Sequence, residues 1–216
     1  MAISQKKPSV KLTAGAQYIC FNEGDTNGDF SADAYETDVI KLPTVVNVEV
    51  SDNTDSYDSY ASGAIYDSDA PVTSQDITTE QIAFPAAVLA RMRGDTVDEG
   101  VILGAGISTR PWFAYGFVVK RKDGSLDLRW YPKCKLTENT DATATSTESH
   151  SDQTDTTTIR TYGFDENQNK FVRVLTETTG YENVTEEAFF TAPILSIADA
   201  KKLKPTNSST NPSTNP

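Results

Sequence analysis

The residues best placed to do chemistry in this chain lie in one acidic segment near its N-terminus. Oxygen-bearing side chains occupy positions 1, 3, 5, 9 and 12 of a twelve-residue stretch, namely Asp25, Asn27, Asp29, Asp33 and Glu36. Carboxylate and amide oxygens at this spacing are typical of a calcium-binding loop. The sharp turn of such a loop needs glycine at position 6, however, where Phe30 stands. The flanking segments also alternate like strands, so we favour an acidic hairpin tip with solvated carboxylates.

Other residue types used in catalysis or cofactor binding are sparse. The only histidine, His150, lies among Ser, Thr and Asp residues with no apolar neighbours to fix its geometry, which argues against a catalytic triad. Gly104 and Gly106 lack the third glycine of a phosphate-binding loop, and Pro111 stands where the following helix would run. No pair among the 31 acidic residues can be singled out as a glycosidase site. The sequence therefore predicts neither an enzyme nor a cofactor.

The cysteine content and the distribution of apolar residues indicate the compartment. Cys20 and Cys134 are the only cysteines, too few for a disulfide framework or for a Cys/His metal cluster. Residues 1–8 are polar and do not resemble a signal-peptide core, and no run approaches the roughly 18 apolar residues of a membrane span. We expect a soluble protein of a reducing compartment, with no membrane partner.

The net charge of −12 comes from one stretch of the chain. Residues 21–80 hold 14 Asp or Glu against Lys41 alone, whereas the remainder holds 17 acidic and 18 basic residues. Affinity for nucleic acid comes largely from Lys and Arg that neutralise phosphates. Such an acidic stretch argues against stable DNA or RNA binding, and permits DNA to pass without adhering.

The clearest structural signal is a β-hairpin over residues 112–120 and 126–136. Asp123-Gly124 supplies the turn, because glycine accepts the positive φ that such turns require. In the first arm the aromatic residues share one face and small residues occupy the other, so both faces can be covered. The second arm predicts a buried face with Leu128, Trp130 and Cys134 and a wet face with Asp127 and Tyr131.

Further patterns predict a mainly β fold with one short flanking helix. Additional strands are expected over residues 44–50, near Ile65, and over residues 72–77, 156–162 and 171–176. The helix is expected to begin with Pro85 in its first turn and to end at Gly94. An alternative start at Thr78 would leave this proline inside the helix, where it clashes with a preceding carbonyl.

The expected domain covers residues 1–203 and carries two long exposed loops. Residues 51–70 are rich in Asp, Ser and Tyr, and residues 137–158 contain 12 Ser or Thr. Loops of this length are usually functional or disordered, which suggests contact with neighbouring molecules. Residues 204–216 are expected to be a disordered tail, because they are rich in Pro, Ser, Thr and Asn and contain no apolar residue able to dock.

The order of these elements resembles the major tail tube proteins of phages with long, non-contractile tails. The resemblance spans roughly residues 9–197 and is most specific in the aromatic hairpin, where Tyr131, Lys133 and Lys135 fill an aromatic-x-Lys-x-Lys pattern. An Asp-containing stretch, a strand and a Pro-initiated helix precede it in the same order. Pro132 and the Tyr162-Gly-Phe164 turn depart from the family pattern.

The resemblance implies a β-sandwich or barrel-like subunit of a virion, assembled in the host cytoplasm. Its partners would be copies of itself in stacked hexameric rings, together with the tape measure, tail terminator and distal tail proteins, and DNA would pass through the lumen. Edge strands would pair between subunits. Residues expected in assembly are aromatic side chains of the hairpin and acids of the first loop: Trp112, Phe113, Tyr115, Phe117, Tyr131, Asp52, Asp55 and Asp58.

Two other functions fit parts of the sequence. A β-sandwich recognition module, such as a virion decoration or adhesion domain, would bind carbohydrate through Trp and Tyr. An enzyme would need a cleft with an essential Asp or Glu, and the sequence offers no motif for one.

Overall fold

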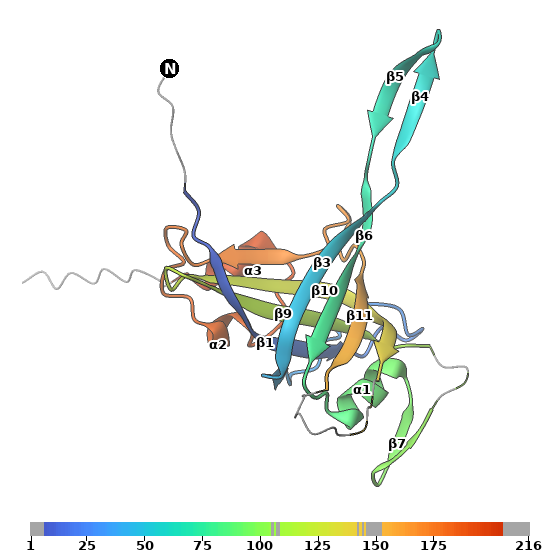
Figure 1. Cartoon of the computed structure of the whole chain (residues 1–216), viewed down its shortest axis with the longest axis vertical. Coiled ribbons are helices and arrows are strands. Elements are labelled where there is room, and N and C mark those ends of the chain that lie inside the picture. The colour runs from blue at the N-terminus through green and yellow to red at the C-terminus, as the bar shows by residue number, and fades with distance from the viewer. Residues whose placement is uncertain are drawn as a thin grey trace, which may run out of the picture.

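The computed structural model describes residues 7–104, 106, 109–141, 143, 145 and 153–204 of the chain. Figure 1 shows a β-rich body from which one long hairpin rises. His150, the residue between Gly104 and Gly106, most of the Ser/Thr-rich stretch 142–152 and residues 205–216 of the expected tail lie outside the described residues.

The main sheet is antiparallel throughout and contains eight strands in the order β2-β1-β9-β10-β11-β6-β3, with β12 also paired to β10. The strands are β1 Lys11–Asn22, β2 Ile40–Leu42, β3 Val45–Thr54, β6 Val72–Gln81, β9 Trp112–Arg121, β10 Leu126–Thr140, β11 Asp155–Thr161 and β12 Val172–Leu175. The predicted mainly β fold is confirmed. The expected hairpin and the other expected strands correspond to these elements and to β5.

The sheet curls, so that β1 and β3, which are far apart in the strand order, lie on either side of one cavity. Residues 11–14 of β1 and residues 46–48 of β3 line one cavity of about 280 Å³. Within the described part of the chain, no hydrogen-bonded ladder joins these two strands. The body is therefore a barrel-like sheet with an open seam between β1 and β3.

Apolar side chains cover both faces of the sheet, so one chain contains two hydrophobic clusters. The first, outside the curl, includes Ala114, Val118, Trp130, Phe189 and Phe190. The second, inside the curl, consists mostly of strand residues and includes Ile19, Phe21, Ile77, Phe113, Tyr115, Phe117, Tyr131, Cys134, Leu136 and Ile159. Because the apolar faces of β9 belong to separate clusters, this strand is buried on both sides.

Strand β9 alternates large and small side chains as its sequence predicts. Gly116 lies on the small face, where a Cβ would stand 2.6 Å from the Phe190 ring and 2.9 Å from the Trp130 ring. Such a separation is well inside van der Waals contact, so the glycine permits the two aromatic rings to approach the strand. The turn that follows uses Gly124 at φ 85°, as expected for Asp-Gly.

The predicted division of β10 into one buried and one wet face is wrong. The pairing of β10 with β9 shifts between Tyr131 and Cys134, where Pro132 interrupts the strand. An irregularity of this kind changes which face the following residues occupy. Consequently Trp130 packs in the outer cluster while Cys134 packs in the inner one, and Tyr131, expected on the wet face, is 1% exposed in the inner cluster.

The structure contains three helices in its described residues, and the sequence predicted only the first. Helix α1, Ala86–Arg93, follows Pro85 and ends at Gly94, as expected, and residues 72–81 form β6 instead of the alternative helix start. The missed helices are α2, Glu186–Phe189, and α3, Ile197–Lys202. Thr185 and Ser196 cap them by accepting hydrogen bonds from Ala188 N at 3.2 Å and Asp199 N at 3.0 Å.

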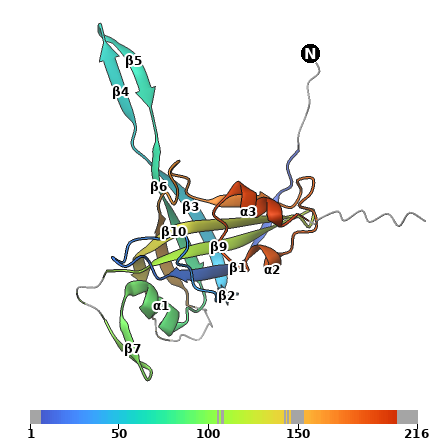
Figure 2. The same cartoon turned by 180° about the vertical axis from the view of Figure 1, so that it is seen from behind.

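Residues 51–70, expected to be a loop, instead form strands. Strand β3 continues to Thr54, and β4, Tyr57–Ala61, pairs with β5, Ala64–Asp69, in a separate two-stranded sheet. Figures 1 and 2 show this hairpin rising beyond the body as a continuation of β3 and β6. In the other expected loop, β10 extends to Thr140 and β11 begins at Asp155, so its ends are strands as well. A second short hairpin pairs β7, Thr96–Asp98, with β8, Val101–Leu103.

Candidate assembly surfaces

The acidic segment of residues 23–36 folds as a turn that uses its own carboxylates. Asp25 Oδ1 accepts hydrogen bonds from the backbone N of Asn27 at 2.8 Å and of Asp29 at 2.9 Å. These backbone donors lower the pKa of Asp25, since hydrogen bonds to a carboxylate favour its charged form. Strands β1 and β2 flank the segment, in agreement with the hairpin-tip interpretation.

Phe30 occupies the position where a calcium loop needs glycine, and it anchors the segment to the body. Its ring meets Trp112 edge-on with centroids 6.2 Å apart and Tyr35 at 6.0 Å. The ammonium of Lys133 lies 5.0 Å from the Phe30 centroid and 5.1 Å from that of Trp112, while Lys135 lies 4.0 Å from the latter. Cation–π contacts of this length stabilise the stack, so Lys133 holds Phe30 against Trp112, and Lys135 supports Trp112.

Glu36, the last of the calcium candidates, is engaged by a residue outside the acidic segment. It forms an ion pair with Arg91 of α1, whose guanidinium also stacks 3.9 Å from the Phe21 ring centroid. Within the described residues, no group of three or more His, Cys, Asp or Glu side chains is arranged to hold a metal ion. The structure therefore does not bring Asp25, Asp29, Asp33 and Glu36 together.

The aromatic residues expected in assembly are core residues of a single chain. Phe113, Tyr115, Phe117 and Tyr131 are at most 3% exposed, so they pack within their own chain, and their part in assembly stays a prediction. Their alternating spacing is equally compatible with a sheet covered on both faces by its own chain. Trp112 is half-buried beneath Phe30 and the two lysines. Trp130 and Tyr131 are also closed to carbohydrate, contrary to what a stacking platform requires.

The hairpin of β4 and β5, together with residues 55 and 56, is called the arm, and it is exposed along its whole length. Its large apolar side chains, Tyr57, Tyr60, Ile65 and Tyr66, are between 53% and 81% exposed. The acidic candidates Asp55 and Asp58 lie here, and Asp52 lies just before it at the end of β3. An isolated two-stranded hairpin is marginally stable in water, so an arm of this composition is suited to contact another molecule.

Strand β3 lies at one end of the main sheet and is unpaired along one edge. Among the described residues its ladder partner is β6 alone. Across the seam, residues 11–14 of β1 pair only with β9, and Leu12 and Val46 beside the seam are well exposed. Open edges of this length are templates for strand pairing with another chain.

The outer face of β3, β6 and β11 is polar across its width. The register places Glu49, Thr78 and Thr158 in one row and Ser51, Asp76 and Arg160 in the next. Arg160 donates to Asp76 through two hydrogen bonds of 2.7 and 2.9 Å, which lowers the pKa of Asp76. The face therefore presents hydroxyl groups and carboxylates, while the intervening residues Ile77 and Ile159 point into the core.

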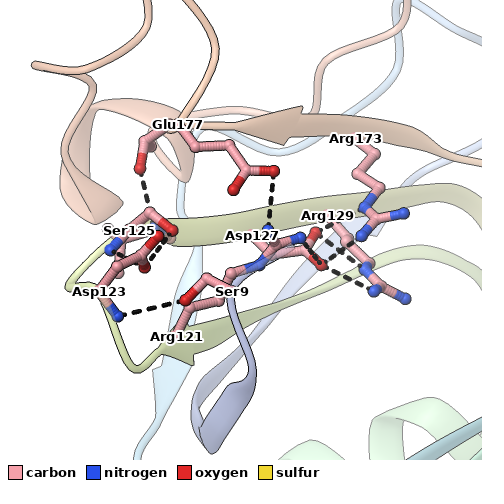
Figure 3. A network of polar contacts seen from close by, with 10 residues as sticks. Ser9, Arg121, Asp123, Ser125, Asp127, Arg129, Arg173 and Glu177 are labelled. Atoms are coloured by element: carbon pink, nitrogen blue, oxygen red, sulfur yellow. Dashed lines mark hydrogen bonds and ion pairs between the residues drawn. The ribbon is translucent and has the colours of Figure 1, made fainter. Parts of the chain in front are cut away.

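A buried ion cluster, absent from the sequence-based expectations, joins β12 to the β9–β10 hairpin (Figure 3). Asp127 is fully buried and accepts paired hydrogen bonds from Arg129, at 2.9 and 3.1 Å, and from Arg173, at 2.6 and 2.7 Å. Arg121 lies 3.7 Å from Asp127 and 2.8 Å from Glu177. Burial alone would raise the pKa of Asp127, but the arginines lower it to about 2. The sequence signal that could have indicated this cluster is the spacing of Asp127 and Arg129, which places both side chains on one face of a strand.

Neither a protein-family model nor a curated protein matches this chain. Among solved structures, it is similar to a chain in the cryo-EM structure of an extracellular contractile injection system, the PVC sheath-tube complex in its extended state. The two share 13% sequence identity with a TM-score of 0.40, and the overlap covers 73% of this chain and 87% of the other. A similarity at this level carries no functional argument, so function must be judged from the surfaces above.

No helix among the described residues is long and apolar enough to span a membrane.

Proposed function

We propose that this chain is a structural subunit that assembles with copies of itself into a hollow tube, like the tail tube proteins that its sequence resembles. The observation that carries the proposal is the open edge of β3 beside the seam with β1. A strand from a second copy satisfies the unpaired backbone groups of such an edge. Repeating this head-to-tail pairing forms a ring when a whole number of copies completes a full turn.

The arm supports a second kind of contact, between rings. It projects beyond the body in both views (Figures 1 and 2) and carries exposed Tyr and Ile side chains that no part of its own body covers. Tyrosine supplies a large contact area and a polar tip at low conformational cost. We therefore assign the arm to stacking, one of two segments, residues 51–70 or the terminal arms, that the sequence left open for this contact.

The polar face of β3, β6 and β11 is the best candidate for the lumen. Asp76 is neutralised by Arg160, which leaves Glu49 and Glu80 among hydroxyl and amide groups. Six copies of a chain with net charge −12 carry −72 formal charges, and exposed charge acts over a Debye length of about 8 Å at physiological salt. A hydroxyl-rich, weakly acidic wall repels phosphates without binding them, so DNA passes through freely.

The remaining features of the proposed function follow from the sequence resemblance. It implies hexameric rings in a phage tail, a tape measure protein inside the tube, terminator and distal tail proteins at its ends, and a role in DNA ejection. The proposal involves no catalysis and no cofactor.

Electron microscopy of the concentrated, purified chain tests the proposal. We expect stacked rings or tubes from the wild type. A variant in which residues 56–70 are replaced by a two-residue Asn-Gly turn keeps the pairing of β3 with β6, and we expect it to remain folded and to form single rings without long tubes. A wild type that stays monomeric at every concentration would overturn the proposal, and glycan-array binding by that monomer would instead favour the recognition module.

A further inference from the structure

We propose that the hairpin of β7 and β8 docks into an apolar groove between β12 and α3 of a second copy. The inference rests on the proposed self-assembly and names a specific pair of surfaces for it. The hairpin follows α1, while the groove belongs to the C-terminal part of the chain. Neither surface takes part in the contacts assigned above to β3 and to the arm.

The hairpin has the composition of a buried element but is exposed in one chain. Val97, Val101, Ile102 and Leu103 are between 41% and 64% exposed, although Val97 and Ile102 pair directly across the two strands. Three residue pairs with no covering layer are too few to hold a hairpin in water. Clustered exposed aliphatic residues of this kind mark a contact with another protein surface.

The groove is the concave counterpart that the chain offers. Its volume is about 590 Å³, and its apolar walls come from Phe171, Val174, Leu175, Tyr181 and Ile197. Phe171 and Ile197 are exposed in the single chain. A mainly apolar groove with a few polar groups at its margin is suited to receive aliphatic side chains.

Charge at the two surfaces is complementary. The tip of the hairpin carries Asp98 and Glu99 and no basic residue. The segments that form the groove, residues 164–181 and 195–204, carry five basic and four acidic residues in a chain whose net charge is −12. Ion pairs engage Asp199 with Lys202, Arg173 with Asp127 and Glu177 with Arg121. Lys170, Lys201 and Lys204 then stand against Asp165 and Glu166, so the acidic tip meets a small local excess of positive charge.

The positions of the surfaces require a second copy. Figures 1 and 2 place the β7–β8 hairpin and α3 at opposite ends of the body, with the main sheet between them. A chain therefore cannot fill its own groove. A contact between two different surfaces on opposite ends is heterologous, and heterologous contacts generate rings or filaments.

Cysteine cross-linking tests the assignment directly. Val101→Cys and Ile197→Cys are prepared as separate full-length proteins, one with a mass tag, and are mixed under mild oxidation. We expect a disulfide between the two variants, because Cβ atoms must approach to about 4 Å for the bond to form. Native Cys20 and Cys134 are buried, and burial raises the pKa of Cys20 to about 11, so they contribute no background.

The matched control is Ile82→Cys mixed with Ile197→Cys, since Ile82 is equally exposed but lies outside both surfaces. We expect little cross-linking in this mixture. In an independent arm, Ile102→Asp should raise the protein concentration needed for assembly by about tenfold or more, because it brings a charge into an apolar groove, whereas Ile82→Asp should not.

The outcomes separate this inference from the proposed function. Tubes from the wild type without cross-linking of Val101→Cys to Ile197→Cys would overturn the groove assignment alone. Cross-linking without rings or tubes under any condition would support the pairing and overturn the tube. Absence of both would overturn both proposals.

Discussion

The β9–β10 hairpin and the arm are both antiparallel hairpins that contain aromatic residues, yet one is the centre of the core and the other is fully exposed. In β9 the side chains between the aromatic residues are Ala, Gly and Val, which allow a second layer to pack. In the arm they are Asp and Ser, which stay solvated. The residues between the aromatics therefore decide whether a hairpin packs on both faces within its own chain or stays exposed.

The largest expected effect is on the core hairpin. Trp130→Ala removes a fully buried indole that packs against Phe190 and donates from Nε1 to Phe189 O at 3.2 Å. We expect the free energy of unfolding to fall by about 3–5 kcal/mol. Urea unfolding of the monomer measures this, and a loss below about 1 kcal/mol would contradict the assignment of Trp130 to the core.

A smaller loss is expected where the core hairpin is most tightly packed. Gly116→Ala adds a methyl group that collides with the rings of Phe190 and Trp130. Overpacking of this kind costs up to about 3 kcal/mol. The control is Gly106→Ala, where a Cβ meets no atom within 4 Å and stability should be unchanged.

The buried ion cluster should make the core hairpin sensitive to acid. The pKa of Asp127 is lowered to about 2 in the folded chain by Arg129 and Arg173, against about 4 when unfolded. Its contribution of about 2 kcal/mol is present above pH 4 and is lost as the pH falls toward 2. The difference in unfolding free energy between the wild type and Asp127→Asn, measured across this range, should shrink as the pH falls. A difference independent of pH would contradict the expectation.

The smallest effect on stability is expected in the arm. Tyr60→Ala with Tyr66→Ala removes exposed side chains, so thermal or urea unfolding of the monomer should change by less than about 0.5 kcal/mol. The same variant should form fewer and shorter tubes in electron micrographs. Normal tubes from this variant would show that the arm does not carry the contact between rings.

The sequence by itself determined the local elements of this protein. Alternation and Asp123-Gly124 predicted β9 and β10, and Pro85 with Gly94 predicted α1, because strand periodicity, turn geometry and helix capping depend on neighbouring residues. The acidic segment was also predicted as a hairpin tip, since Phe30 stands where a calcium loop needs glycine. The capping residues Thr185 and Ser196 were equally readable but were missed.

Only the tertiary structure decided which faces of these elements are buried and which residues meet. The irregularity at Pro132 moves Cys134 to the opposite face from Trp130, and packing by the C-terminal helices covers the small face of β9. Asp127 and Arg173 lie 46 residues apart and meet only because β12 pairs with β10. Burial and ion pairing depend on contacts between distant segments, so they cannot be predicted from the spacing of residues along the chain.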